Sequence, residues 1–175
     1  MSDYAVAIAE ALDLSVEETD IMRYASMMHD IGKIGVPDSI LDKDGALTTE
    51  ERKIMQRHTI IGGKLFATSK FPMVKSAGEI ALTHHEKYDG TGYPRGLKGK
   101  NIPLNGRIVT IADWFDALVS KRSYKKAWSF EEAVKDIEER SGTFFDPDII
   151  KVFLCIKPTL KKLLRANQSI ESAIA

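Results

Sequence analysis

The spacing of apolar residues restricts the fold of this chain more than any other feature. Apolar side chains recur every three or four positions through most of the sequence, and we find no convincing stretch with the alternation of a β-strand. Three capping boxes, in which Ser or Thr is followed three residues later by Glu, mark helix starts at Ser15, Thr48 and Ser129. The sequence therefore predicts an all-α protein, built as a helical bundle.

Glycine, proline and N-cap residues indicate where the helices begin and end. The predicted helices begin at about Tyr4, at Ser15 (running toward Asp30), at Thr48, at Pro72 (ending near His84), at about Arg107, at Ser129 and at Asp146, with a kink or division at Pro158. Residues 88–106 contain five Gly and two Pro and form the one long irregular segment. A loop of that length inside a compact domain is usually functional or disordered.

The composition fits a single domain. The chain has 175 residues with 25 basic and 25 acidic side chains, so no net charge attracts it to nucleic acid or anionic lipid. No apolar run approaches the roughly 18 residues of a membrane span. Cys155 is the single cysteine, which excludes an internal disulfide and fits a reducing cytosol. We expect a cytoplasmic domain without a DNA or RNA partner or a membrane span, and with Cys155, Trp114 and Trp128 in its core.

Metal-binding side chains gather in a few short motifs. All four histidines lie in them, and an aspartate follows on another predicted helix. A single His at a helix end is more often a surface residue, but together these side chains, on separate helices, favour one assembled metal site. The candidate ligands are His29, Asp30, His58, His84, His85 and Asp113. Imidazole and carboxylate together suit Fe, Mn or Zn better than Mg or Ca.

Asp30 is the natural bridging ligand among these residues, because a carboxylate has two oxygens and can contact two cations. Six ligands, with water filling the gaps, are enough for two divalent metal ions. Two such ions about 3.5–4 Å apart activate water and stabilise both oxygens of an in-line displacement at phosphorus. Lys33 follows Asp30 by three residues and shares its helix face. This set of residues predicts phosphodiester hydrolysis.

Four segments together resemble the HD-GYP family, a branch of the HD phosphohydrolase superfamily. They are HDIGKIGVP (His29–Pro37), the lone His58, HHEKYDGTGYP (His84–Pro94) and RIVTIADWFDALVSKRSYKKA (Arg107–Ala127). The similarity runs from about Tyr4 to about Phe153, and FDPDII (Phe145–Ile150) also fits the family. It implies a helical HD-GYP domain over residues 1–167, with 168–175 as a C-terminal tail. It also implies two or three metal ions, commonly iron or manganese, and hydrolysis of the bacterial messenger cyclic di-GMP to pGpG or GMP.

The resemblance assigns roles to individual residues. The six candidate ligands coincide with the metal ligands of the family, and Lys33 coincides with its lysine beside the scissile phosphate, where it neutralises charge or protonates the leaving oxygen. We therefore expect Lys33 and Asp30 to be catalytic. The expected substrate-binding residues are Gly92, Tyr93 and Pro94 of the GYP motif, with Tyr93 stacking on a base, and the phosphate-facing Arg122 and Lys125.

The sequence departs from the family pattern at its start. Family members normally have another metal-binding His on the first helix, about two turns before the position of Tyr4, and this sequence begins after that position. We therefore expect an occupied site made by Asp30, His58, His84 and His85. A second site made by His29, Asp30 and Asp113 is expected to bind its cation more weakly, and a third metal is not expected.

Two alternatives to a cyclic di-GMP phosphodiesterase remain open. The first is a catalytically weak or inactive module that binds cyclic di-GMP, or docks a GGDEF-type diguanylate cyclase through the GYP loop. The second is an HD hydrolase of another nucleotide, against which the GYP loop argues. In either case the resemblance implies fusion or partnership with a sensor module, because such domains usually follow one.

Overall fold

The computed structural model describes residues 1–120 and 127–174, with side chains up to residue 169. Arg122 and Lys125 lie outside the described residues. The helices are α1 (Ser2–Ala11), α2 (Val16–Ser26), α3 (Asp38–Leu41), α4 (Thr49–Phe66), α5 (Pro72–Thr83), α6 (Leu104–Val119), α7 (Phe130–Glu139), α8 (Pro147–Cys155) and α9 (Lys157–Ile174), with 3-10 helices η1 (Ile31–Gly35) and η2 (Gly99–Asn101). The described part of the chain forms no strand beyond one isolated bridge, which confirms the all-α prediction.

The three predicted capping boxes all form. Ser15, Thr48 and Ser129 are the N-caps of α2, α4 and α7, and each side chain accepts a hydrogen bond from the backbone of the Glu three residues later. The Glu side chain bonds back to the N-cap backbone in each case. Each box satisfies backbone donors that the first turn of a helix leaves unpaired. These helix starts are therefore determined locally.

Some boundaries differ from the prediction. Helix α2 ends at Ser26, because the next amides bond three residues back: His29 N–H donates to the Ser26 carbonyl at 3.3 Å. Helix α6 begins three residues early, at Leu104. The predicted division near Pro158 is confirmed, since α8 ends at Cys155 and α9 begins at Lys157. The predicted tail boundary at residue 167 falls inside α9.

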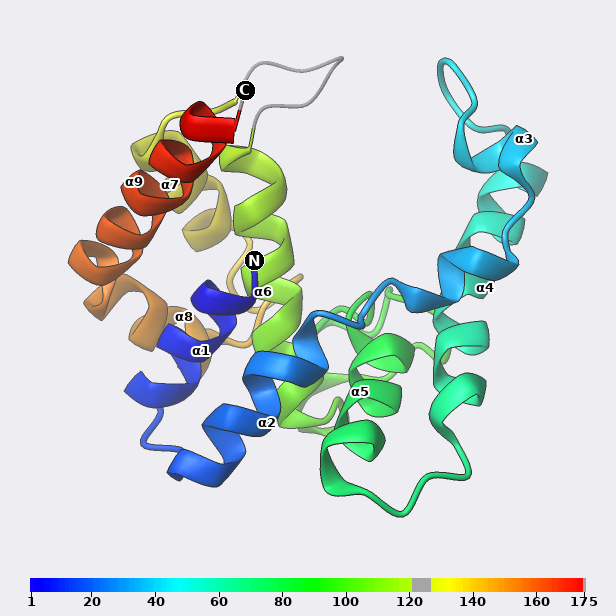
Figure 1. The fold of residues 1–175 in the computed structure, drawn as a ribbon, viewed down its shortest axis with the longest axis horizontal. Helices are drawn as coiled ribbons and strands as arrows, with labels where there is room; N and C mark the ends of the chain where they lie inside the picture. The colour runs from blue at the N-terminus through cyan, green and yellow to red at the C-terminus, as the bar shows by residue number, and fades with distance from the viewer. Residues whose placement is uncertain (121–126, 175) are drawn as a thin grey trace.

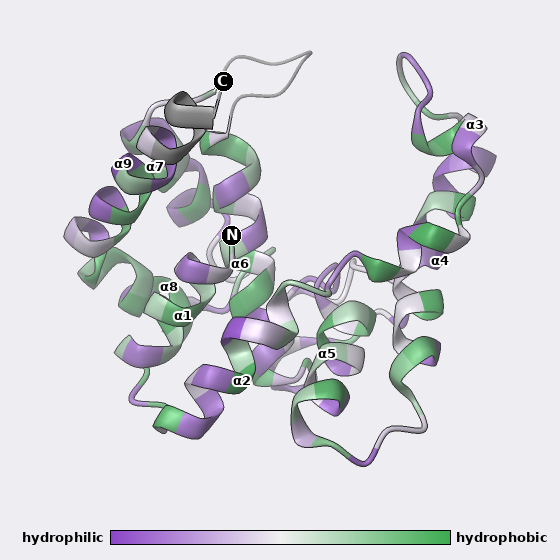
Figure 2. Ribbon diagram, in the orientation of Figure 1, coloured by the Kyte–Doolittle hydropathy of each residue, from purple (hydrophilic) through white to green (hydrophobic). Residues whose placement is uncertain are grey.

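The largest buried side chains join α1, α6 and α8. The ring of Phe115 on α6 packs edge-on against Tyr4 of α1 at 4.9 Å and against Phe153 of α8 at 5.6 Å, and all three residues are buried. Figure 2 shows apolar residues along the same helices. Cys155 is exposed, contrary to our expectation. It lies two residues after Phe153, about 200° further round the helix, and so points away from the core.

Trp128 also corrects an expectation, because 36% of it is exposed. Trp114, by contrast, is half-buried beside Phe144 and Phe145, with its Nε1–H donated to Asp136 at 2.8 Å. None of the described helices is both long and apolar enough to cross a bilayer.

Helices α5 and α6 lie in the middle of the molecule, with further helices on both sides (Figure 1). Helix α5 packs against α2, α4 and α6, and α4 packs against η1. Helices α3 and α4 extend on one side of α5, and α7 to α9 lie beyond α6 on the other. Contact between η1 and α4 is close, since a Cβ added at Gly32 would lie 1.9 Å from the His58 carbonyl oxygen. This packing brings the segment after α2 against the middle of α4.

Candidate metal centre

The six predicted ligands come from four helical regions. His29 and Asp30 lie in the turn between α2 and η1, and His58 lies on α4. His84 is the C-cap residue of α5, with His85 directly after it. Asp113 lies on α6. The structure brings all six side chains together, although His29 and Asp30 occupy a turn rather than the predicted helix.

Four of these residues make one compact donor group. One ligand atom from each of Asp30, His58, His84 and His85 lies within 4.8 Å of the others. Asp30 Oδ1 is 3.3 Å from His58 Nε2 and 3.8 Å from His84 Nε2, and the two Nε2 atoms are 3.5 Å apart. Donors that share one cation at about 2.1 Å are separated by similar distances. Three nitrogens and one oxygen therefore fit a single transition-metal ion.

His29 and Asp113 form a second group with Asp30. His29 Nε2 lies 3.4 Å from Asp30 Oδ2 and 3.6 Å from Asp113 Oδ1. Asp30 thus directs one oxygen toward each group. This arrangement fits a bridging carboxylate, and it leaves the second group with three protein donors.

Backbone carbonyls orient three of the imidazoles. The Nδ1 atoms of His29, His58 and His84 lie 2.9, 2.7 and 3.0 Å from the carbonyl oxygens of Ser26, Met55 and Ile80. With hydrogen on Nδ1, each Nε2 keeps its lone pair free to bind a cation. We missed these supports in the sequence, although each carbonyl belongs to a residue three or four positions before its His.

Asp30 carries the electrostatic signature of a cation ligand. Burial would raise its pKa, but contact with His84 and Lys33 outweighs burial and holds the pKa well below its usual range. Its Oδ1 is buried and makes no hydrogen bond within the described part of the chain. Its Oδ2 accepts a 2.6 Å hydrogen bond from Lys33 Nζ. An ionised carboxylate with an unpaired buried oxygen is suited to a metal ion.

The histidines differ in their affinity for protons. Burial and the neighbouring His84 and His58 lower the pKa of His85 to about 2. Burial also lowers the pKa of His58. At His29 burial lowers the pKa, but Asp113 and Asp30 raise it by more, so the net shift is upward. His58 and His85 are thus neutral donors near pH 7, whereas a cation must displace a proton from His29 more often.

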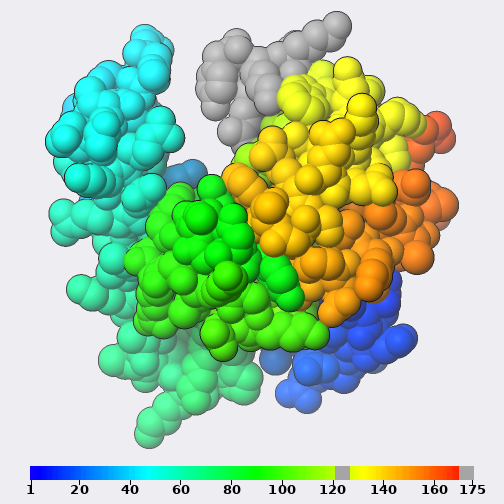
Figure 3. Space-filling view, turned by 180° about the vertical axis from the view of Figure 1, so that it is seen from behind, coloured from blue at the N-terminus to red at the C-terminus, as the bar shows by residue number. Residues whose placement is uncertain are grey.

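The GYP motif folds back onto His85, one of the candidate ligands. The Tyr93 ring stacks on the His85 ring with centroids 4.8 Å apart and planes 29° apart, and Tyr93 N–H donates to the His85 carbonyl at 3.2 Å. A Cβ added at Gly92 would lie 2.2 Å from the Lys87 nitrogen, so glycine is required there. The Tyr93–Pro94 peptide is cis. Figure 3 shows this segment, in green, over the middle of the opposite face of the molecule.

Two further charged residues near the site were missed in the sequence. Glu86 is 1% exposed and bonds to the loop that carries the GYP motif. The positive charge of Arg52, on α4, acts on the Tyr93 hydroxyl and partly offsets the burial and carboxylates that raise its pKa. Glu86 acts on residues nine and eleven positions later, and Arg52 acts on Tyr93 from helix α4. No local sequence pattern predicts either interaction.

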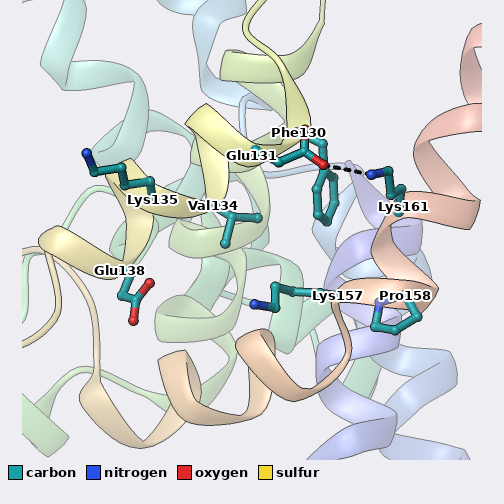
Figure 4. Close-up of a pocket in the computed structure, with 8 residues that line it drawn as sticks. All are labelled: Phe130, Glu131, Val134, Lys135, Glu138, Lys157, Pro158 and Lys161. Atoms are coloured by element: carbon teal, nitrogen blue, oxygen red, sulfur yellow. Dashed lines mark hydrogen bonds and ion pairs between the residues drawn. The ribbon is translucent and has the colours of Figure 1, made fainter.

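A separate surface hollow lies between α7 and α9 (Figure 4). It has a volume of about 540 Å³ and is lined by Phe130, Glu131, Val134, Lys135, Glu138, Lys157, Pro158 and Lys161. Lys161 pairs with Glu131 across it at 2.7 Å. None of the six candidate ligands lines this hollow, so we assign it no part in the metal site.

The fold and the site together define a class of protein: an all-helical domain in which His and Asp from separate helices form a cluster that could hold a divalent metal ion. The sequence profile described as HD domain matches residues 1–149. The chain belongs to the HD domain family. Members of this family bind divalent metals, which agrees with the donor group of Asp30 and three histidines.

Curated relatives match most of the chain. A cyclic di-GMP phosphodiesterase of Thermotoga maritima is 44% identical over 95% of this chain and 45% of its own length. The cyclic di-GMP phosphodiesterase response regulator RpfG of Xanthomonas campestris is 45% identical over 93% of this chain and 43% of its own. A 3′3′-cGAMP-specific phosphodiesterase of Vibrio cholerae is 44% identical over 86% and 29%. The chain thus spans less than half the length of these relatives.

A solved structure has the same fold. The crystal structure of a cyclic GMP-AMP specific phosphodiesterase of V. cholerae aligns with a TM-score of 0.69 at 21% sequence identity, covering 98% of this chain and 46% of that one. This likeness supports the helical fold.

Proposed function

We propose that this chain is an HD-GYP phosphodiesterase domain, spanning residues 1–167, that hydrolyses cyclic di-GMP to pGpG, GMP or both in the bacterial cytoplasm. The observation that carries the proposal is the convergence of Asp30, His58, His84 and His85 within 4.8 Å. Asp30 turns its other oxygen toward His29, which lies 3.6 Å from Asp113. The six residues are thus arranged to hold two divalent cations, which we propose are iron or manganese.

The donor set suits phosphodiester chemistry. Two divalent cations, when bound, supply Lewis acidity and an activated water for in-line attack at phosphorus. Asp30 holds the centre together through its two oxygens. Lys33 stands beside it with 41% of its side chain exposed. Its ammonium group is therefore placed to neutralise charge on the phosphate or to give a proton to the leaving oxygen.

The substrate side of the site rests on the GYP turn and nearby cations. Tyr93 stacks one ring face on His85, and its other face or its hydroxyl is proposed to contact a base or a phosphate. Arg122 and Lys125 are proposed to contact phosphate, although they lie outside the described residues. Arg52 is exposed and forms no ion pair with a described residue, so we add it to the proposed phosphate-binding residues.

The names of the relatives favour cyclic dinucleotides as the substrate class. Of the three curated relatives described above, two are named for cyclic di-GMP and one for 3′3′-cGAMP. A purified sample loaded anaerobically with Fe(II) or Mn(II) should therefore be assayed on both nucleotides in parallel. We expect linear product from cyclic di-GMP, and none from the His58→Ala variant. A metal-loaded chain that cleaves neither nucleotide would contradict the proposal.

A binding module is the second candidate, because the group of His29, Asp30 and Asp113 offers three protein donors. Such a module would hold cyclic di-GMP or dock a GGDEF-type diguanylate cyclase without cutting the nucleotide. Calorimetry distinguishes the two functions. Tight cyclic di-GMP binding that persists in the His58→Ala variant, with no turnover in either protein, would favour the module. Fusion or partnership with a sensor module is proposed for both functions.

A further inference from the structure

Glu86 is a buried carboxylate to which the proposed reaction gives no role. It directly follows His85 and is 1% exposed. Its Oε1 accepts the Arg95 N–H at 2.8 Å and its Oε2 accepts the Leu97 N–H at 2.9 Å. Burying a carboxylate is costly unless hydrogen bonds replace its hydration. Glu86 is therefore committed to the segment that follows the GYP motif.

That segment is pressed onto the backbone around Glu86. Tyr93 N–H bonds to the His85 carbonyl at 3.2 Å, and Gly99 N–H bonds to the Tyr88 carbonyl at 2.8 Å. Gly92 lies so close to Glu86 that an added Cβ would be 2.6 Å from the Glu86 Cα. The turn thus has two attachments: Tyr93 to the backbone of His85, and residues 95 and 97 to the carboxylate of Glu86.

His85 is the ligand that most needs this turn. The other three histidines each place Nδ1 within hydrogen-bond distance of a helix carbonyl. Among the described residues His85 has no such bond, and its ring instead lies flat against Tyr93 at 4.8 Å. His85 also contacts the rings of His84 at 4.0 Å and His58 at 5.1 Å, so Tyr93 is the ring outside the donor group that holds the His85 imidazole against them.

We propose that Glu86 is a positioning residue: by holding the GYP turn in place it keeps Tyr93 stacked on His85, and thereby keeps a ring nitrogen of His85 directed into the four-donor group. The inference rests on the proposed metal centre and deepens it. Glu86 itself lies behind the site and acts through Tyr93. Residues that orient metal ligands in this way typically contribute about 10–100-fold to metal affinity.

Manganese affinity tests the proposal without requiring turnover. In calorimetric titrations with Mn(II), Glu86→Ala and Tyr93→Ala should each weaken the tight site by about tenfold or more. The double variant should bind Mn(II) no more weakly than the single variant with the lower Mn(II) affinity, because both changes remove the same support. Tyr93→Phe keeps the ring and should bind Mn(II) like the unaltered chain.

Asp146 provides a matched control. It is also 1% exposed, and its carboxylate accepts the Asp148 N–H at 2.8 Å and pairs with Arg107. Asp146→Ala should lower the free energy of unfolding and leave the Mn(II) affinity unchanged. If Glu86→Ala does not fold, Glu86→Gln keeps one acceptor oxygen and should show a smaller loss of affinity in the same direction.

Two results would overturn the inference. One is a folded Glu86 variant that binds Mn(II) as tightly as the unaltered chain, and the other is a double variant in which the two losses multiply. If such a Glu86 variant also loses cyclic di-GMP cleavage, the first result still applies, and the proposed reaction remains intact. A different result would separate the two proposals. If neither the unaltered chain nor any variant cleaves cyclic di-GMP, but the Mn(II) affinities change as expected, the proposed reaction is contradicted and the role of Glu86 is supported.

Discussion

Asp113 on α6 places a carboxylate oxygen 3.6 Å from Nε2 of His29, in the turn after α2. These two residues stand outside the compact donor group of Asp30, His58, His84 and His85. Asp30 belongs to both groups, because its Oδ2 lies 3.4 Å from His29 Nε2. The proposed centre therefore divides into a four-donor site and a three-donor site that share one carboxylate.

The division predicts a selective effect of Asp113→Asn. This change removes a charged donor from the three-donor site and leaves the four-donor site complete. We expect one Mn(II) ion to bind with nearly unaltered affinity and the second to weaken by about tenfold or more, by analogy with the loss of other ligand-supporting groups. Electron paramagnetic resonance titration with Mn(II) measures both. Equal weakening of the two ions would contradict the division.

Lys33→Met should separate catalysis from metal binding. The Lys33 ammonium lies 2.6 Å from Asp30 Oδ2 but is not one of the four clustered donors. We expect kcat for cyclic di-GMP to fall by about 10²–10³-fold, the usual cost of removing one electrostatic stabiliser. KM and the Mn(II) content should change little. Lys64→Met, at an exposed position of α4, is the matched control. A Lys33 variant with unchanged kcat would exclude the catalytic role.

The metal-free chain should lose stability as the pH falls. The pKa of His58 and the pKa of His85 are lowered, mainly by burial, so both stay neutral in the folded state while they gain protons in the unfolded chain below about pH 6.5. The unfolded state then binds more protons, and each His lowers the free energy of unfolding by up to about 1.4 kcal/mol per pH unit. His29 acts in the opposite direction, because its pKa is raised. The contribution of His29 is complete below about pH 6.5, because His29 is then protonated in both states, so the lowered pKa values of His58 and His85 leave a net loss of stability from about pH 6.5 to about pH 4.5.

Urea unfolding of chelator-treated protein, between about pH 7.5 and pH 4.5, measures this loss. His85→Gln should give a shallower dependence on pH, since it removes one of the two responsible imidazoles. A free energy of unfolding that stays constant or rises toward pH 4.5 would contradict the assigned pKa directions.

Gly32→Ala should destabilise the fold where η1 meets α4. The added Cβ would lie 1.9 Å from the His58 carbonyl oxygen, which is backbone and cannot rotate away. We expect a loss of about 1–3 kcal/mol or more in thermal or urea unfolding, together with weaker Mn(II) binding. Gly35→Ala in the same 3-10 helix meets only side-chain atoms of Ile61 and should cost less. Equal stability of the two variants would argue against the close packing.

The parts of the structure that follow from local chemistry could be predicted from the sequence. The helix starts after Ser15, Thr48 and Ser129 depend on residues three positions apart, and all three form. The exposed side of α8 was harder to identify, because Cys155 sits in an apolar run and its direction depends on where the helix packs. Local spacing therefore predicted the helices better than it predicted their buried faces.

The candidate site shows the same limit of local patterns. The candidate ligands could be named because the chain has only four His and their motifs are distinctive. The partners of Glu86 could not, because its carboxylate bonds to backbone groups nine and eleven residues later along an irregular loop. The early end of α2 was missed as well, since it depends on backbone bonds from Met28 and His29 to carbonyls three residues earlier.

Anomalous diffraction from crystals soaked with Mn(II) tests the central claim most directly, because it locates the cation relative to its donors. We predict that the strongest peak lies about 2.0–2.3 Å from donor atoms of Asp30, His58, His84 and His85, and that a weaker peak lies between His29 and Asp113. A well-ordered cluster without a peak, in crystals that bind Mn(II) elsewhere, would contradict it.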